Sequence, residues 1–202
     1  PLYGGANARP FTTHHNSLDQ DLYLRIADEL YLKRLIIGGL DKVYELSKNF
    51  RNEGMDRNHN PEFTMLEWYE AYADYETMME FVEEMIRTAA KDIGSLNLNW
   101  GGLEIDLSKL FERKPFLDLL KEATGQDVST SDETQLRKMC DEHQISVAPN
   151  ANYGQLLDEL MKRLVEPKLI NPTSSSNITP SLTPLAFLHL CKLEAVVSSV
   201  FL

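Results

Sequence analysis

Residues 50–69 combine arginine with acidic, imidazole and aromatic side chains at spacings that could form a binding site. The candidates are Arg51, Glu53, His59, Phe63, Glu67 and Tyr69. A guanidinium group pairs well with the oxygens of a phosphate, and a phenyl ring can stack on a flat base. A carboxylate and a phenol oxygen together can hold an amine. These residue types therefore indicate a ligand that carries a phosphate, a flat ring and an amine.

A β-hairpin with a long loop is the element expected to position these side chains. Strand-forming residues lie on both sides of the expected loop, namely Val43, Tyr44, Leu46 and Phe50 before it and Phe63, Thr64, Trp68 and Tyr69 after it. Turn-forming residues lie between them, namely Gly54, Asp56, Asn58, Asn60 and Pro61. Long loops inside compact domains are usually functional. From the spacing alone, a hairpin with solvated charges on its outer face is an equally good alternative.

The two-residue period of a strand predicts which of these side chains share a face. Arg51 and Glu53 point to one side if the first strand extends that far. On the second strand, the residues expected to share a face are Phe63, Met65, Glu67 and Tyr69.

Composition bounds the class of protein. The 202 residues suffice for one domain with a core or for part of a larger domain. The first residue is Pro1 rather than Met, so we expect that the chain is cut at its start. The net charge of -11 argues against a generally basic nucleic-acid-binding protein, although a local basic patch could still serve. Two cysteines, Cys140 and Cys191, are too few for a disulfide framework, which favours a reducing compartment.

The region before the hairpin offers further candidates. We expect a loop over residues 1–15, in which Gly4 and Gly5 allow the backbone to approach a ligand closely. His14 and His15 would point to opposite sides of an extended chain, so we predict no metal site there. A strand over residues 21–27 should precede a helix with Asp28 as its N-cap and Glu29 in its first turn, where the helix dipole favours a negative charge.

After residue 71 we expect elements that build the fold and carry no catalytic or binding residues. We predict a helix capped by Asp74 with a core stripe of Met78, Val82, Met85, Ile86, Ala89 and Ile93, and then a hairpin over residues 96–107. Helices should follow from Pro115, from a capping box formed by Thr130 and Glu133, and around residues 156–164. The Ser/Thr-rich run 173–183 reads as a flexible linker, and the apolar residues 185–202 are too interrupted for a membrane span.

Residues 43–71 resemble motif 2 of the class II aminoacyl-tRNA synthetases, in the form seen in lysyl-tRNA synthetases. Neighbouring stretches agree with that family, namely Gly4–Phe11, Thr13–Asn16, Tyr23–Ala27 and Glu29–Leu35. The likeness runs from about residue 4 to residue 173. It implies an α+β fold in which an antiparallel sheet is flanked by helices, with residues 1–173 as part of a catalytic domain and an inserted segment at about 95–170. Residues 174–202 diverge, and our hypothesis is that this end is frameshifted, misspliced or mispredicted from the gene.

The resemblance also implies a role for each candidate. Arg51 would bridge the amino-acid carboxylate and the α-phosphate of ATP as the catalytic residue, Glu53 and His59 would help to place ATP, and Phe63 would stack on adenine. Lysine would be bound by Gly5 through its carbonyl, and by Glu29, Glu67 and Tyr69. Arg57 is a weaker candidate for triphosphate or tRNA contacts, and Asn58 departs from the basic or hydroxyl residue that the family often carries there.

The activity implied is that of a lysine–tRNA ligase, with lysine, ATP and the acceptor end of tRNA(Lys) as substrates. Mg²⁺ is expected with ligands outside this chain. Motif 1 should precede Pro1 and motif 3 should follow the last residue, so we expect weak or no activity from this polypeptide alone. The full-length protein would be a homodimer in the cytoplasm, or alternatively in the mitochondrion, without membrane contact.

Two other readings stay open. One is a ligase that attaches a lysine-type amino acid to a protein, and the other is a non-catalytic synthetase-derived fragment. Aspartate and asparagine enzymes of the same subclass fit less well, because Glu29 and Glu67 would not suit an anionic or neutral side chain.

Overall fold

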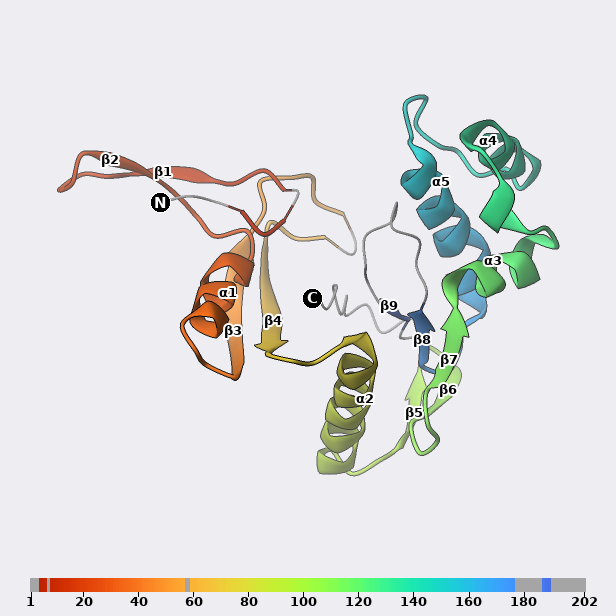
Figure 1. Cartoon of the computed structure of the whole chain (residues 1–202), viewed down its shortest axis with the longest axis horizontal. Coiled ribbons are helices and arrows are strands. Elements are labelled where there is room, and N and C mark those ends of the chain that lie inside the picture. The colour runs from red at the N-terminus through yellow and green to blue at the C-terminus, as the bar shows by residue number, and fades with distance from the viewer. Residues whose placement is uncertain (1–3, 7, 57–58, 177–186, 190–202) are drawn as a thin grey trace. The chain divides into compact units, whose positions relative to one another are not determined.

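The computed structural model describes residues 4–6, 8–56, 59–176 and 187–189 of the chain. These residues form two compact units, residues 1–73 and residues 74–202. Helices and mainly antiparallel strands alternate along both units (Figure 1), which confirms the predicted α+β class. The described strands form four small sheets, one of which contains a parallel pair.

The first unit is built from two hairpins and one helix. Strands β1 (Thr12–His15) and β2 (Gln20–Tyr23) pair antiparallel, helix α1 (Glu29–Ile37) follows, and β3 (Lys42–Phe50) pairs antiparallel with β4 (Glu62–Glu70). Part of the expected N-terminal loop is thus strand β1, and β2 ends earlier than the predicted strand. Among the described strands, β1 and β2 pair only with each other.

The pairing of β3 with β4 decides which side chains share a face. Glu45 lies opposite Glu67 and Asn49 lies opposite Phe63, so the predicted grouping of alternate residues on β4 holds. The condition under which Arg51 and Glu53 would share a face of the strand is not met, because β3 ends at Phe50. The Glu53 amide donates to the Arg51 carbonyl at 2.9 Å, which closes a three-residue turn and bends the chain out of the extended form.

Helix α1 packs on both long strands of the first unit. Its apolar contact is made by Leu32, which is buried, and it ends at Gly38, after which Gly39 adopts a left-handed conformation at φ 98°. Asp28 occupies the N-cap position as predicted, but its side chain makes no capping hydrogen bond to the helix.

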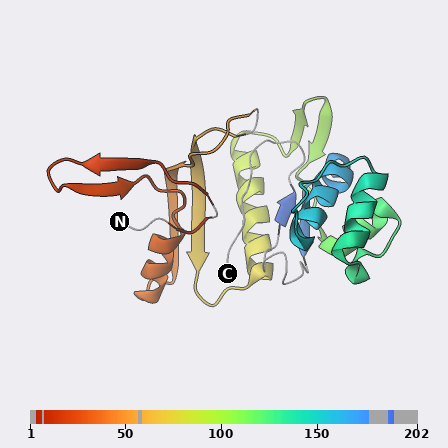
Figure 2. The same ribbon diagram turned by 90° about the horizontal axis from the view of Figure 1, so that it is seen from above.

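The second unit begins with helix α2 (Tyr75–Asp92), whose N-cap Asp74 accepts a hydrogen bond from the Thr77 amide as predicted. Met78 and Val82 of the predicted stripe are buried, whereas Ile93 is exposed because it lies past the last helical turn. The predicted hairpin is present as β5 (Asn97–Trp100) and β6 (Leu103–Asp106), drawn in light green in Figure 2.

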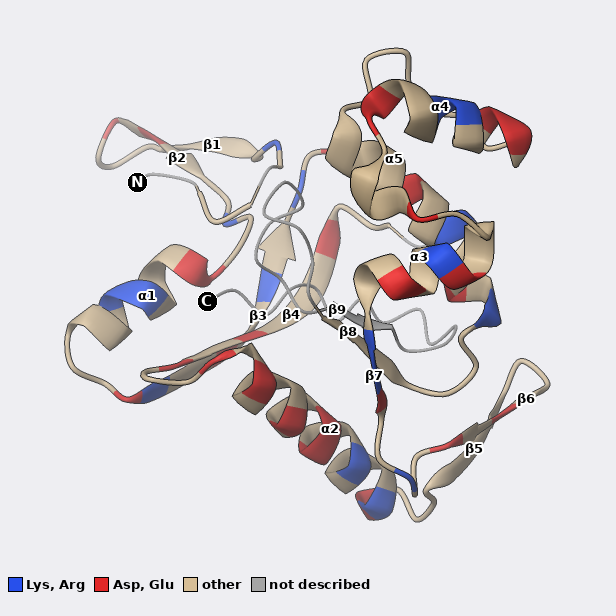
Figure 3. Cartoon of the chain, turned by 45° about the vertical axis from the view of Figure 1, so that its right-hand side comes forward, with Lys and Arg blue, Asp and Glu red and all other residues tan. Residues whose placement is uncertain are grey.

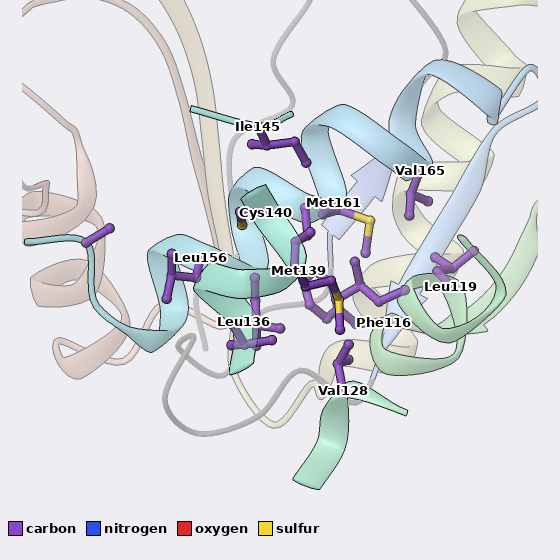
Figure 4. Close-up of a cluster of buried hydrophobic side chains, with 14 residues drawn as sticks. Phe116, Leu119, Val128, Leu136, Met139, Cys140, Ile145, Leu156, Met161 and Val165 are labelled. Carbon is purple, nitrogen blue, oxygen red and sulfur yellow. The ribbon is translucent and has the colours of Figure 1, made fainter. Parts of the chain in front are cut away.

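A helical segment forms the main core of this unit. It contains α3 (Phe116–Thr124), η1 (Val128–Thr130), α4 (Glu133–Glu142), α5 (Tyr153–Leu160), the π-helical turn η2 (Met161–Val165) and η3 (Glu166–Lys168). Apolar side chains from all but the last of these elements meet in one cluster (Figure 4). The predicted capping box of Thr130 and Glu133 is wrong, since Asp132 and Gln135 make the reciprocal bonds two residues later.

Three short strands complete the unit. β7 (Glu112–Pro115) pairs in parallel with β8 (Thr173–Ser176), which pairs antiparallel with β9 (Phe187–His189). The linker prediction is therefore wrong for residues 173–176: Thr173, Ser174 and Ser175 are buried in the central strand. The rest of the predicted linker, residues 177–183, lies outside the described residues, as does most of the divergent tail. In the described part of the chain, no helix is long and apolar enough to cross a membrane.

Candidate active site

Glu67 and Tyr69 form a hydrogen-bonded pair on β4. The Tyr69 hydroxyl donates to Glu67 Oε1 at 2.6 Å, and the Asp28 amide donates to Glu67 Oε2 at 3.1 Å. Burial raises the pKa of Glu67, and the nearby carboxylates of Asp28 and Glu29 raise it further, against the lowering effect of the two hydrogen bonds. Burial and the bond to Glu67 also raise the pKa of Tyr69 well above its usual range, so its hydroxyl stays a donor.

Glu29 brings a second carboxylate from α1 toward this pair. Its side chain is largely buried, and Oε1 accepts a hydrogen bond from Lys33 Nζ at 2.6 Å. The same ammonium group lies 5.8 Å from the centroid of the Tyr69 ring. The Lys33 ammonium group thus lies near both the Glu29 carboxylate and the Tyr69 ring. Red at the start of α1 and blue on its next turn mark this acidic and basic pair in Figure 3.

Gly5 lies directly against Glu29. Its φ of +87° is in the left-handed region, and a Cβ at this position would lie 2.8 Å from Glu29 Cβ and 3.2 Å from Ala27 Cβ. Only glycine combines that backbone conformation with so close an approach. The predicted residues Gly5, Glu29, Glu67 and Tyr69 are therefore brought together around the first turn of α1.

Arg51 and Phe63 form a second pair at the base of the hairpin loop. The Arg51 guanidinium carbon lies 5.0 Å from the centroid of the Phe63 ring. Arg51 Nε also donates to the Ile26 carbonyl at 3.3 Å, which ties this pair to the segment that leads into α1. The guanidinium plane can accept an anion on its remaining donors while the ring offers an apolar surface.

Glu53 and His59 lie in the loop, where each bonds to another residue. Glu53 Oε1 accepts from the Arg9 amide at 3.3 Å, and the Asn52 amide donates to the Arg9 carbonyl at 2.7 Å. His59 Nδ1 lies 2.8 Å from both carboxylate oxygens of Asp56, and both side chains are exposed. The candidates Arg57 and Asn58 lie outside the described residues.

Sequence reasoning missed the polar network beneath the Glu67 pair. Asp28 is fully buried and bonds to Arg25, Ser47 and Asn49. The alternation of Glu45, Ser47 and Asn49 along β3 was the available signal, since three polar residues at spacing two indicate a polar inward face. The described residues contain no group of three or more His, Cys, Asp or Glu that could hold a metal ion.

A sequence model of the family described as tRNA synthetases class II (D, K and N) matches residues 1–174. The chain belongs to the class II tRNA synthetases. This match covers the first unit completely and ends within β8.

Individual class II synthetases agree with this assignment. The chain is 48% identical over 188 residues to a lysine–tRNA ligase of Carboxydothermus hydrogenoformans, covering 92% of this chain and 38% of the relative. Identity is 47% over 192 residues to the lysine–tRNA ligase of Aquifex aeolicus, covering 94% and 32%, respectively. The lysine–tRNA ligase of Staphylococcus epidermidis is 49% identical over 188 residues, covering 92% and 38%. The chain thus spans about a third of the length of these relatives.

Proposed function

We propose that this chain supplies the lysine- and ATP-binding hairpin of a lysine–tRNA ligase, an enzyme that forms lysyl-adenylate from lysine and ATP and transfers the lysyl group to tRNA(Lys). The observation that carries the proposal is the acidic cluster of Glu29, Glu67 and Tyr69. In this cluster the ammonium group of Lys33 already lies near both Glu29 and the Tyr69 ring. A bound lysine would present the same chemical group.

Discrimination between amino acids follows from charge. Burial and the nearby Glu29 carboxylate make the Glu67 carboxylate costly to keep ionised, so a cationic side chain would offset this repulsion. An aspartate side chain would add to the repulsion, and an asparagine side chain would leave it unchanged. Among the amino acids that the matched family handles, this supports lysine.

The first chemical step needs an anion clamp more than a proton carrier. The lysine carboxylate oxygen attacks the α-phosphorus of ATP, a new C–O–P bond forms, and pyrophosphate leaves with the electron pair of the broken P–O bond. Arg51 would contact the carboxylate and the α-phosphate, holding the two anions together against their repulsion. Phe63, whose ring lies beside Arg51, would stack on adenine.

The proposal also includes further contacts to ATP, a metal ion, an oligomeric state and a cellular location. Glu53 and His59 would help to place ATP. Mg²⁺ would be held by ligands elsewhere in the longer protein. We further propose a homodimer for the full-length protein and a cytoplasmic location, which the bacterial origin of the relatives supports, with the mitochondrion as the alternative.

Lysine-dependent ATP–pyrophosphate exchange tests the activity. We expect the chain to show weak exchange and Arg51→Ala to reduce it by about a hundredfold or more, the usual effect of removing a group that stabilises transition-state charge. Arg34→Ala is the matched control, because Arg34 is an exposed arginine on α1 that contacts Tyr31 instead.

Calorimetric titration with lysine and with ATP makes the test informative when exchange is absent. Lysine binding without exchange supports a binding site that needs the rest of the longer protein for catalysis. A folded chain that binds neither lysine nor ATP contradicts the proposal and favours a non-catalytic fragment. Binding and exchange with other lysine-type amino acids, but not with lysine, would favour the ligase that modifies a protein.

A further inference from the structure

We propose that Asp28 is a positioning residue, which holds the Glu67 carboxylate and the first turn of α1 in the arrangement that receives the substrate ammonium group. The inference rests on the proposed function for the identity of that substrate. It assigns a role to a residue that the sequence places at a helix N-cap but whose side chain caps nothing.

The Asp28 side chain is completely buried and fully engaged. Oδ1 accepts from Arg25 Nη1 at 2.8 Å, while Oδ2 accepts from Ser47 Oγ at 2.7 Å and from Asn49 Nδ2 at 3.2 Å. Ser47 and Asn49 are alternate residues of β3, so both project from the same face of that strand. Asp28 therefore fastens the start of α1 to two consecutive positions of the inward face of β3.

The backbone of Asp28 connects this anchor to the candidate site. Its amide donates to Glu67 Oε2 at 3.1 Å, and its carbonyl accepts from the Tyr31 and Leu32 amides at 3.1 and 3.2 Å. The next residue is Glu29, the second acidic candidate. One residue thus orients the Glu67 carboxylate directly and fixes the turn from which Glu29 projects.

Charge explains why an acid occupies this buried position. An unpaired buried carboxylate is costly, but Arg25 supplies a cation that also bonds to Glu45. Bonds to Asp28 first and to Glu45 second raise the pKa of Arg25, so this arginine keeps its charge throughout the accessible pH range. An ordinary capping role would place the Asp28 carboxylate on an amide of the first helical turn, and the observed partners lie on other elements.

The test compares Asp28→Ala, Asp28→Asn and Asp41→Asn in the full chain. Asp28→Asn keeps the shape and one acceptor oxygen, whereas Asp28→Ala removes both. Asp41→Asn makes the same change of charge at an exposed position in the α1–β3 turn. Hydrogen exchange, read by NMR, reports the amide of residue 28, and calorimetry gives the dissociation constants of lysine and ATP.

We expect Asp28→Ala to speed exchange of the residue 28 amide by about tenfold, the effect of losing one hydrogen bond to a charged group. Lysine should bind about tenfold more weakly, while ATP affinity and the protection of the central β3–β4 amides stay unchanged. Asp28→Asn should show a smaller loss in the same two quantities, and Asp41→Asn should show none.

The outcomes separate this inference from the proposed function. Unchanged exchange at residue 28 in both Asp28 variants overturns the positioning role, whatever lysine does. Loss of protection confined to that amide in a chain that binds no lysine supports the positioning role and counts against the proposed function. If Asp28→Ala does not fold, Asp28→Asn is compared with Asp41→Asn in the same two measurements. An equal loss of lysine and ATP affinity would contradict the inference.

Discussion

Glu67 lies where burial, two hydrogen bonds and two other carboxylates act on one side chain. The charged and titratable groups near it are Asp28 and Glu29 at the start of α1, Glu45 opposite it on β3, and Tyr69 on its own strand. Its raised pKa means that the folded chain holds this proton more tightly than the unfolded chain does. The resulting stabilisation is present below the ordinary pKa of glutamate and is lost as the pH rises through the raised value.

Lysine binding should show the opposite dependence on pH. An ammonium group needs the ionised carboxylate, so lysine affinity should fall as the pH is lowered through the raised pKa of Glu67. The decline should therefore begin at a higher pH than for an exposed glutamate. Calorimetry between about pH 4 and pH 8 checks this, with the ordinary glutamate pKa of about 4.3 as reference.

Glu67→Gln is the control for that experiment. This variant should bind lysine more weakly at neutral pH, and its affinity should change less with pH. A wild-type affinity that stays constant down to the ordinary glutamate range would contradict the assignment of Glu67 to the ammonium group.

Gly5→Ala should weaken lysine binding without unfolding the chain. The added Cβ would meet Glu29 Cβ at 2.8 Å in a backbone conformation that L-residues avoid, at a cost of about 1–3 kcal/mol. Either the glycine loop or Glu29 must move, and a calorimetric titration with lysine should report about a tenfold or greater loss. Gly54→Ala is the matched control, because nothing lies within 4 Å of a Cβ there. Equal losses in the two variants would contradict the contact between Gly5 and Glu29.

At the scale of elements, strands and helices with a strong local pattern were predictable from sequence. The β3–β4 and β5–β6 hairpins, α1, α2 and α3 follow from alternation, turn residues and terminal glycines. The end of β3 was not predictable, because a turn bond between Glu53 and Arg51 competes with continued strand pairing. β8 was also missed, since its Thr-Ser-Ser-Ser sequence carries no apolar alternation and is fixed by neighbours distant in the chain.

The cap of α4 offers a direct test of one wrong prediction. Asp132 Oδ1 accepts from the Gln135 amide at 2.8 Å, and the Gln135 side chain accepts from the Asp132 amide at 2.8 Å. Asp132→Ala should therefore lower the free energy of unfolding of the helical segment by about 1 kcal/mol. Thr130→Ala, at the position that the sequence pattern favoured, should cost much less. Urea denaturation followed by circular dichroism compares them, and equal losses would contradict the assigned cap.

The structure brings only part of the predicted site residues together. Gly5, Glu29, Glu67 and Tyr69 meet because α1 packs on β3 and β4, whereas Glu53 and His59 bond within or beside the loop. Asp28 escaped prediction because an acid before a helix is ordinarily a cap. Its actual partners on β3 depend on tertiary packing, which no local pattern encodes.

At the scale of the whole molecule, limited proteolysis should detect the division into two units. Tyr72 precedes the boundary, is fully exposed and adopts a positive φ of 62° between β4 and α2. Chymotrypsin should therefore cut after Tyr72 early, and mass spectrometry should find a fragment that begins at Ala73. Tyr72→Ala should delay that fragment specifically. Earlier cleavage within the α3–α5 core would contradict two separately compact units.

The parallel pairing of β7 with β8 has a consequence for how this region can evolve. The helical segment leaves the sheet after Pro115 and returns at Thr173, and the register of the two strands puts these positions only about 10 Å apart along neighbouring strands. A segment with adjacent ends can be lengthened, shortened or exchanged while the strands that carry it remain in place. Natural variation in length should therefore concentrate between these two residues, and the same junction is the natural place to graft a foreign helical module.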